Sequence, residues 1–276
     1  MDITMFRLKS KKYQHFLCIL LSFSLTAVLC LAAEQPGTYA AAALTGKALA
    51  EKVYQRENGE SAAGKMEMIL ADASGFERHR EFQFFRKDYG DLSKNLIRFT
   101  EPADIRGTAF LSIEQPGGET EQFLYLPSLR RTRRIIASQK GRRFVNSDFT
   151  YEDMERRPVE KFGHRINGES RIDGKDCYIL ESLPKKDASS QYFLIQSFIQ
   201  KADFMPLQVD FFDKSGKRVK TYRVLETETI QGIPTETRVR MEDMERKHRT
   251  DLKVLAFSYN VELDDALFTK RKMENW

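Results

Sequence analysis

The most concentrated chemistry in this 276-residue sequence is a run of seven cations, with no acid, between residues 130 and 143. Cations at this density indicate a docking surface for an anionic partner, such as a lipid head group or an acidic protein surface. The alternative is a solvated strand edge whose positive charge prevents edge-to-edge aggregation. The candidate docking residues are the four arginines at the start of the run, namely Arg130, Arg131, Arg133 and Arg134.

Acidic and cap-forming side chains follow this run over residues 146–153. Ser147 or Asp148 is suited to capping a short helix near 148–157. Asp148, Glu152 or Asp153 is then expected to pair with arginines. We interpret this segment as structural pairing and not as a catalytic site.

No arrangement of residues indicates catalysis or metal binding. The histidines His79, His164 and His248 are each isolated, and neither a zinc motif nor a nucleophile elbow is present. The segment 168–176 resembles a phosphate-binding loop, but it has five residues between its glycines and Asp176 in place of Ser or Thr. Two successive tight turns fit it better. We therefore expect no enzyme, no metal and no cofactor; because carboxylates are abundant, a hydrolase of the cell envelope remains an alternative.

The N-terminal residues are typical of a cleavable secretory signal. Four basic residues precede an apolar stretch over 16–32, and small residues with Pro36-Gly37 follow it. We predict a signal peptide over residues 1–32 and one domain over 33–276, and a retained signal anchor is the alternative. Lipid anchoring at Cys30 is disfavoured because Leu29 precedes it. Export argues against a nucleic-acid partner.

Removing this leader changes the charge and the cysteine chemistry. The whole chain has 45 Lys and Arg against 40 Asp and Glu, but the leader contains four of the basic residues and one of the acidic ones. Residues 33–276 then have 41 basic and 39 acidic residues, a net charge of +2. Cys177 is the one cysteine left in that part of the sequence, so no internal disulfide is expected. We interpret it as a small buried apolar residue.

The remaining chain predicts one helix and then many strands. Residues 44–56 have an apolar i, i+4 stripe, with Thr45 as the cap and Asn58-Gly59 as the end. Turn signals separate the strand-like segments, and no helical pattern lies between them, so an antiparallel meander is expected. The predicted strands are 65–71, 78–87, 94–100, 107–114, 120–126, 131–136, 175–182, 191–200, 205–213, 217–228, 233–241 and 250–259.

This mainly β pattern has few helices to cover the sheet. The candidates are residues 44–56, a short helix near 148–157 and the C-terminal tail. An antiparallel sheet with one apolar face must cover that face or curl around it. The sheet is thus expected to curve and to leave a space for an apolar ligand, unless packed side chains fill it.

Three long segments carry a family resemblance: residues 96–111, 121–134 and 147–153. Shorter matches at 173–178, 211–216, 220–221 and 265–269 continue it in order over most of residues 43–275. Together they resemble the outer-membrane lipoprotein-sorting proteins, the longer relatives of the LolA and LolB carriers. The sequence departs from relatives at 144–147, where they tend to have Met-Gly-Ser, so a different local turn is expected.

The resemblance implies an incomplete, strongly curved antiparallel β-barrel, covered by a few α-helices around an apolar cavity. It implies a periplasmic carrier that takes acyl chains of lipoproteins or other lipids toward the outer membrane, with peripheral or transient membrane contact. The alternative is a non-enzymatic accessory protein of an inner-membrane transporter of the resistance-nodulation-division type. On the carrier hypothesis, inward strand residues line the cavity, or else they are packed core: Phe82, Phe84, Phe99, Phe110, Leu124, Leu126, Val209, Phe211 and Tyr222.

Overall fold

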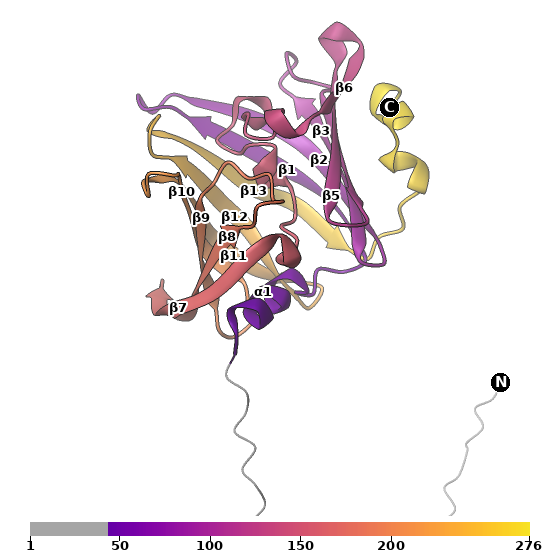
Figure 1. The fold of residues 1–276 in the computed structure, drawn as a ribbon. Coiled ribbons are helices and arrows are strands. Elements are labelled where there is room, and N and C mark those ends of the chain that lie inside the picture. The colour runs from indigo at the N-terminus through magenta and orange to yellow at the C-terminus, as the bar shows by residue number, and fades with distance from the viewer. Residues whose placement is uncertain (1–43) are drawn as a thin grey trace, which may run out of the picture. The chain divides into compact units, whose positions relative to one another are not determined.

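The computed structural model describes residues 44–276, which contain one continuous antiparallel sheet of 13 strands (Figure 1). The predicted signal peptide, its cleavage site and Cys30 lie outside the described residues. Within residues 44–276, no helix has the length and apolar character needed to cross a membrane.

The sheet is a meander whose two edges are β6 and β7. Each strand pairs with its neighbour in sequence, except that β1 pairs with β13 and that β6 and β7 are unpaired with each other. This confirms the prediction of a mainly β, antiparallel and incomplete structure. The strands are β1 (Ser61–Ala71), β2 (Glu77–Tyr89), β3 (Leu92–Glu101), β4 (Ala109–Gln115), β5 (Glu119–Leu126), β6 (Arg131–Ile135), β7 (Phe162–Ile172), β8 (Lys175–Pro184), β9 (Leu194–Gln200), β10 (Pro206–Phe212), β11 (Arg218–Ile230), β12 (Ile233–Asp243) and β13 (His248–Tyr259).

Strand β7 was not predicted from the sequence. It is an edge strand with mostly exposed side chains, so it lacks the apolar alternation that identifies a half-buried strand. The turn predicted at Asn167-Gly168 is also wrong, because these residues lie within strand β7. The register against β8 shifts between Ile166 and Glu169, which makes this position a bulge within β7, and Gly168 has a positive φ there. The second predicted turn, at Asp173-Gly174, does join β7 to β8.

Helix α1 (Gly46–Tyr54) forms as predicted. Thr45 is its cap, and the Oγ1 atom of Thr45 accepts a hydrogen bond from the Ala48 amide. The helix buries Leu49 and Ala50 against Leu180 and Ile199 of the inner face. The C-terminal segment, with the 3-10 turn η6 (Asp265–Phe268) and helix α2 (Lys270–Glu274), packs Phe268 and Met273 on the outer face beside β3, β4 and β5.

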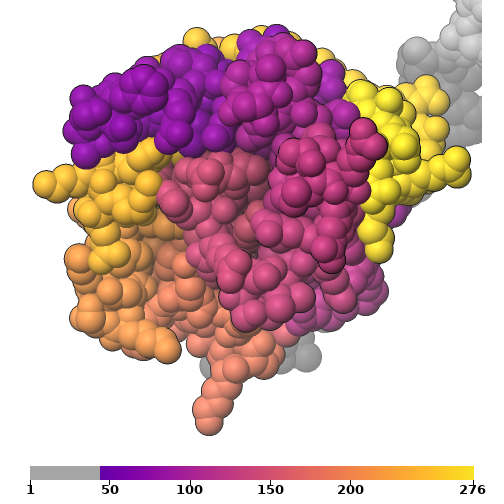
Figure 2. All heavy atoms as spheres, turned by 90° about the horizontal axis from the view of Figure 1, so that it is seen from above, coloured from indigo at the N-terminus to yellow at the C-terminus, as the bar shows by residue number. Residues whose placement is uncertain are grey.

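Residues 136–161 connect the edge strands β6 and β7, and we call this segment the strap. Its aromatic side chains pack against both halves of the sheet, as Phe144 and Tyr151 join the cluster on β1–β5 while Phe149 joins the cluster on β9–β12. Figure 2, viewed from above, shows the strap between the indigo and magenta first half and the orange second half. The strap therefore spans the gap that the unpaired edges leave.

The helix predicted near 148–157 is wrong. The strap contains only short 3-10 turns, because Val145 and Asn146 have positive φ and the side chains of Ser147 and Asp148 bond elsewhere. The 3-10 turns of the chain before β7 are η1 (Pro127–Leu129), η2 (Ala137–Gln139), η3 (Phe144–Asn146), η4 (Glu152–Met154) and η5 (Val159–Lys161).

The packing of Phe144 leads to a stability prediction. Its ring is 1% exposed, lies 5.0 Å from the ring of Phe110 and 5.9 Å from that of Tyr151, and joins the strap to the sheet. Phe144→Ala should lower the free energy of unfolding by about 3–5 kcal/mol, measured by urea titration. Phe76→Ala is the control, because Phe76 is 64% exposed and its loss should cost less than about 0.5 kcal/mol. Equal effects of the two variants would contradict this role of the strap.

Candidate functional site

The inner face of the sheet supplies the walls of the candidate site. The registers place Phe82 opposite Phe99, Phe84 opposite Ile97, and Ile97 opposite Phe110, so these side chains share one face of β2, β3 and β4. Alternation along each strand fixes this face, and packing of the strap covers its upper part. Of the nine residues expected to line a cavity, some therefore border a pocket and others are packed in the core.

Two pockets lie between the inner face, α1 and the strap. The first has a volume of about 470 Å³ and is bordered by Phe84, Phe110 and Val209 of the expected set. The second has a volume of about 330 Å³, is mostly apolar, and is bordered by Phe82 and Phe84. The structure places the other five residues in or against the packed clusters and not at these pockets: Phe99, Leu124, Leu126, Phe211 and Tyr222.

The two pockets are adjacent. Five residues border both of them, and these are Arg56, Asn58, Phe84, Ile97 and Met154. We call the pair the two-lobed pocket, with the apolar lobe between β1, β2, β12, β13 and the strap, and the mixed lobe beneath α1. Met154 comes from the strap and was not predicted from the sequence, since no local pattern indicates which strap residue faces a pocket.

A third, polar cleft adjoins the junction of the lobes. It is bordered by residues 54–60 after α1, by the β2–β3 turn and by Arg156. Arg56 and Asn58 border this cleft and both lobes. The two-lobed pocket therefore meets a polar surface at the C-terminal end of α1.

A partly buried carboxyl group lies at the apolar lobe. Glu236 Oε2 accepts a hydrogen bond of 2.6 Å from the Tyr222 hydroxyl, and Glu236 Oε1 is 3.9 Å from Arg56 Nη1. Burial raises the pKa of Glu236 above its ordinary value, although the nearby Arg56 acts in the opposite direction. Tyr222 thus has a polar role that the sequence did not indicate, because its partner lies on the next strand.

The mixed lobe contains one histidine, which is uncharged. His164 Nε2 lies 3.0 Å from the carbonyl oxygen of Val159, and His164 Nδ1 lies 2.9 Å from Ser182 Oγ. A carbonyl oxygen only accepts, so Nε2 carries the proton and Nδ1 accepts from Ser182. Burial lowers the pKa of His164, which makes the neutral form dominant at pH 7.

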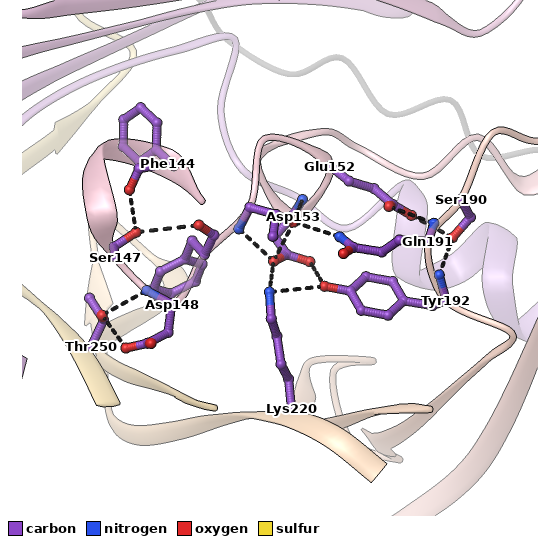
Figure 3. A network of polar contacts seen from close by, with 12 residues as sticks. Phe144, Ser147, Asp148, Glu152, Asp153, Ser190, Gln191, Tyr192, Lys220 and Thr250 are labelled. Carbon is purple, nitrogen blue, oxygen red and sulfur yellow. Dashed lines mark hydrogen bonds and ion pairs between the residues drawn. The ribbon is translucent and has the colours of Figure 1, made fainter. Parts of the chain in front are cut away.

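Buried carboxylates hold the strap to the second half of the sheet. Asp148 Oδ2 accepts from Thr250 Oγ1 at 2.6 Å and lies 2.5 Å from His248 Nδ1, while Asp148 Oδ1 accepts from Arg246 Nη1 at 3.2 Å (Figure 3 shows Asp148 and Thr250). The predicted pairing of Asp148 with an arginine is confirmed. The predicted capping by Ser147 or Asp148 is wrong, because Ser147 Oγ donates backward to the Phe144 carbonyl.

Asp153 makes the second anchor, shown in Figure 3. Its Oδ1 accepts 2.8 Å from the Tyr192 hydroxyl and its Oδ2 accepts 3.1 Å from Lys220 Nζ. Burial, together with the Asp153 charge, raises the pKa of Tyr192 and keeps its hydroxyl protonated. Asp153 also has an arginine partner, since Arg157 Nη2 lies 3.8 Å from Asp153 Oδ1. Glu152, the third acid considered, accepts instead from Ser190 Oγ and the Gln191 amide.

The four candidate docking arginines lie on the edge strand β6 or just before it. All four are exposed, and Arg134 pairs with Glu121 at 2.7 Å. Arg130, Arg131 and Arg133 have no ion pair within residues 44–276. Leu129, beside them, is 66% exposed. Cys177 is fully buried, which confirms its interpretation as an apolar residue.

Replacing Asp153, the second anchor, tests how the strap is held. Asp153→Asn keeps the side-chain size but leaves the ammonium group of Lys220, whose side chain is 10% exposed, without its counter-charge. We expect a loss of about 3 kcal/mol in the free energy of unfolding and faster hydrogen exchange of strap amides. Asp187→Asn is the exposed control and should change neither. Unchanged strap exchange in Asp153→Asn would contradict the anchor.

Comparisons with known proteins agree with this architecture. A family model described as "Uncharacterized protein" matches residues 91–275, which is more than half of the chain. No curated protein matches the chain.

Solved structures are similar over most of the described residues. A DUF1329 family protein from Desulfovibrio piger is 30% identical with a TM-score of 0.79, over 83% of this chain and 97% of that chain. An outer membrane lipoprotein-sorting protein domain from Vibrio parahaemolyticus is 28% identical with a TM-score of 0.78, over 83% and 98%. A LolA superfamily protein from Nitrosomonas europaea is 24% identical with a TM-score of 0.66, over 83% and 100%, and shows the fold alone.

These matches confirm the resemblance found in the sequence motifs. They also agree with a 13-stranded antiparallel sheet that is not closed and has few helices. The chain is therefore a member of the DUF1329 family and has the fold of the outer membrane lipoprotein-sorting proteins of the LolA superfamily.

Proposed function

We propose that this protein is a periplasmic carrier that binds the acyl chains of lipoproteins or other lipids and transfers them toward the outer membrane. The observation that carries the proposal is the two-lobed pocket, whose apolar lobe is bordered by Met66, Met68, Phe82, Leu252 and Val254. The relative from Vibrio parahaemolyticus, which is described as a lipoprotein-sorting protein domain, supports a lipid or lipoprotein carrier at the level of the family. The basic, apolar leader of the sequence supports export.

A pocket of this kind performs its task without catalysis. Exposing an acyl chain to water costs about 0.8 kcal/mol per CH₂ group. Covering the chain with Phe and Met side chains removes most of this barrier to transfer between membranes. Binding alone therefore suffices, and the proposal requires no cofactor.

Native mass spectrometry of protein purified from the periplasm tests the proposal. The wild-type protein should retain lipid. Val254→Trp places a large ring in the apolar lobe and should reduce lipid occupancy at least about tenfold. Leu255→Trp is the matched control, since Leu255 is the next residue, is 43% exposed and does not border the pocket. Wild-type protein that is free of lipid and takes none up would overturn the carrier function.

A second candidate function is suggested by the unpaired arginines. We propose that Arg130, Arg131 and Arg133, with Arg134 beside them, dock an acidic surface of an envelope partner, such as an inner-membrane transporter of the resistance-nodulation-division type. Their exposure on an edge strand, without ion pairs in the described part of the chain, supports this. An accessory protein of this kind needs no cargo.

Replacing the four arginines by Ser separates the two functions. Capture of the transporter from solubilised membranes should fall at least about tenfold, because the charge complementarity is lost. Lipid retention should stay unchanged. The control replaces Lys214 and Lys217 by Ser, two cations of the β10–β11 turn. Unchanged capture by the arginine variant would show that these residues are a solvated edge and no more.

A further inference from the structure

The inner wall of β2, β3 and β4 changes in character along its length. The upper rows of facing residues are aromatic or aliphatic, as Phe82 faces Phe99 and Phe84 faces Ile97, which faces Phe110. These rows lie under the strap, and Phe82, Phe99 and Phe110 are at most 2% exposed. Phe82, Phe84 and Ile97 of these rows border the apolar lobe and offer it apolar contacts only, whereas Phe99 is packed core.

The next rows on the same face are polar. Arg86 faces Asn95, which faces Ser112, and one row further Asp88 faces Ser93, whose amide donates to Glu114 Oε2 at 3.0 Å. Three neighbouring strands therefore pass from apolar to polar in the same direction, toward the polar cleft that contains Asn58 and Arg156. A wall with this gradient is complementary to one amphiphile, with its chain under the strap and its head at the cleft.

The charges at the polar end are already paired within the protein. Arg86 Nη1 lies 2.8–2.9 Å from both oxygens of Asp88, and Arg86 Nη2 donates to the carbonyl oxygens of Asn58 and Gly59. The guanidinium of Arg156 lies 4.0 Å from the Tyr54 ring centre and its Nη1 is 3.4 Å from Glu114.

Charged side chains also form ion pairs where the strap borders the mixed lobe. Glu155 pairs with Lys140 at 2.7 Å, and Asp153 pairs with Lys220 at 3.1 Å and with Arg157 at 3.8 Å. His164 is neutral, as argued above. An anionic head placed here would have to compete with carboxylates for each cation, at a cost in desolvation.

Uncharged groups of the mixed lobe also have hydrogen-bonding capacity to spare. Ser112 is 2% exposed and borders the mixed lobe, and its hydroxyl has no hydrogen bond within the described residues. Asn95 Nδ2 makes one long bond of 3.4 Å, to Ser93 Oγ. Ser197, on β9 at the opposite wall, also borders this lobe. Hydroxyl and amide groups facing one space are suited to a ligand that both donates and accepts.

We propose that the mixed lobe binds the uncharged, hydroxylated head of an amphiphile, such as a glycerol or sugar head group, while the acyl chain lies in the apolar lobe. This rests on the proposed carrier function and names its ligand class. Ser112 and Asn95 are the positions that select the head. Phosphate or carboxylate heads on the same chain bind more weakly, because Arg86, Arg156 and Arg157 each lie within 4.0 Å of a carboxylate with which the anion would compete.

Competition between ligands of one chain length tests the head group. The probes are 1-monooleoylglycerol, oleate and 1-oleoyl lysophosphatidate, each added to full-length mature protein stripped of lipid and loaded with a fluorescent apolar dye. Monooleoylglycerol should displace the dye at a concentration about tenfold lower than either anion. Equal or tighter binding of an anion would overturn the inference and leave the carrier function intact. If none of the three displaces the dye and native protein holds no lipid, the carrier function itself fails.

A conservative variant tests the positions. Ser112→Ala should weaken monooleoylglycerol about fivefold or more and leave oleate unchanged, because only the hydroxylated head loses a partner. Asn95→Leu should act in the same direction. Ser258→Ala, at an exposed serine of β13 away from the pockets, is the control. Unchanged monooleoylglycerol affinity in both folded variants, checked by circular dichroism, would overturn the role of these residues.

Discussion

The structure depends on closing the gap between two strand edges that do not pair. Strands β6 and β7 end the sheet on opposite sides, and the strap that connects them must cover the concave face. A segment without helix or strand leaves backbone and side-chain polar groups to be satisfied one by one. Here buried carboxylates do this, since Asp148 bonds Thr250 and Arg246, and Asp153 bonds Tyr192 and Lys220. The strap is thereby held on the half of the sheet that lies far from β6.

This closure explains why the space inside is divided. Phe144 and Tyr151 fill the upper part of the first half, while Phe149 fills the second, so packed aromatic rings occupy much of the curved interior. What stays open lies below, where Met154 of the strap, Phe84 and Ile97 border both lobes. The inward side chains of β2 change from apolar at Phe82 to charged at Asp88, so one end of the wall is apolar and the other is polar. For the proposed carrier function, this gradient favours a ligand whose chain lies in the apolar lobe and whose head lies in the mixed lobe.

The sequence predicted most of the sheet and little of the site. Twelve segments with period-two alternation became strands, since burial of one face leaves a local signature. Strand β7 was not predicted, because an exposed edge strand needs no alternation of apolar and polar residues. Among the nine residues expected at a cavity, Phe82, Phe84, Phe110 and Val209 border a pocket, and Phe99 and Phe211 are packed core. Alternation assigns a face, but whether that face meets a void or another side chain depends on how the strap packs.

The sequence by itself determined the antiparallel meander, the cap of α1 by Thr45, the buried character of Cys177 and the family, because each has a local pattern or an ordered set of motifs. Tertiary structure alone decided that Thr250 bonds Asp148 across 102 residues of the chain and that Tyr192 and Lys220 bond Asp153 across 39 and 67. It also decided that the two lobes meet at Arg56. The physical reason is the same in each case. Partners joined across a curved sheet are specified by its curvature and register, and no local spacing records them.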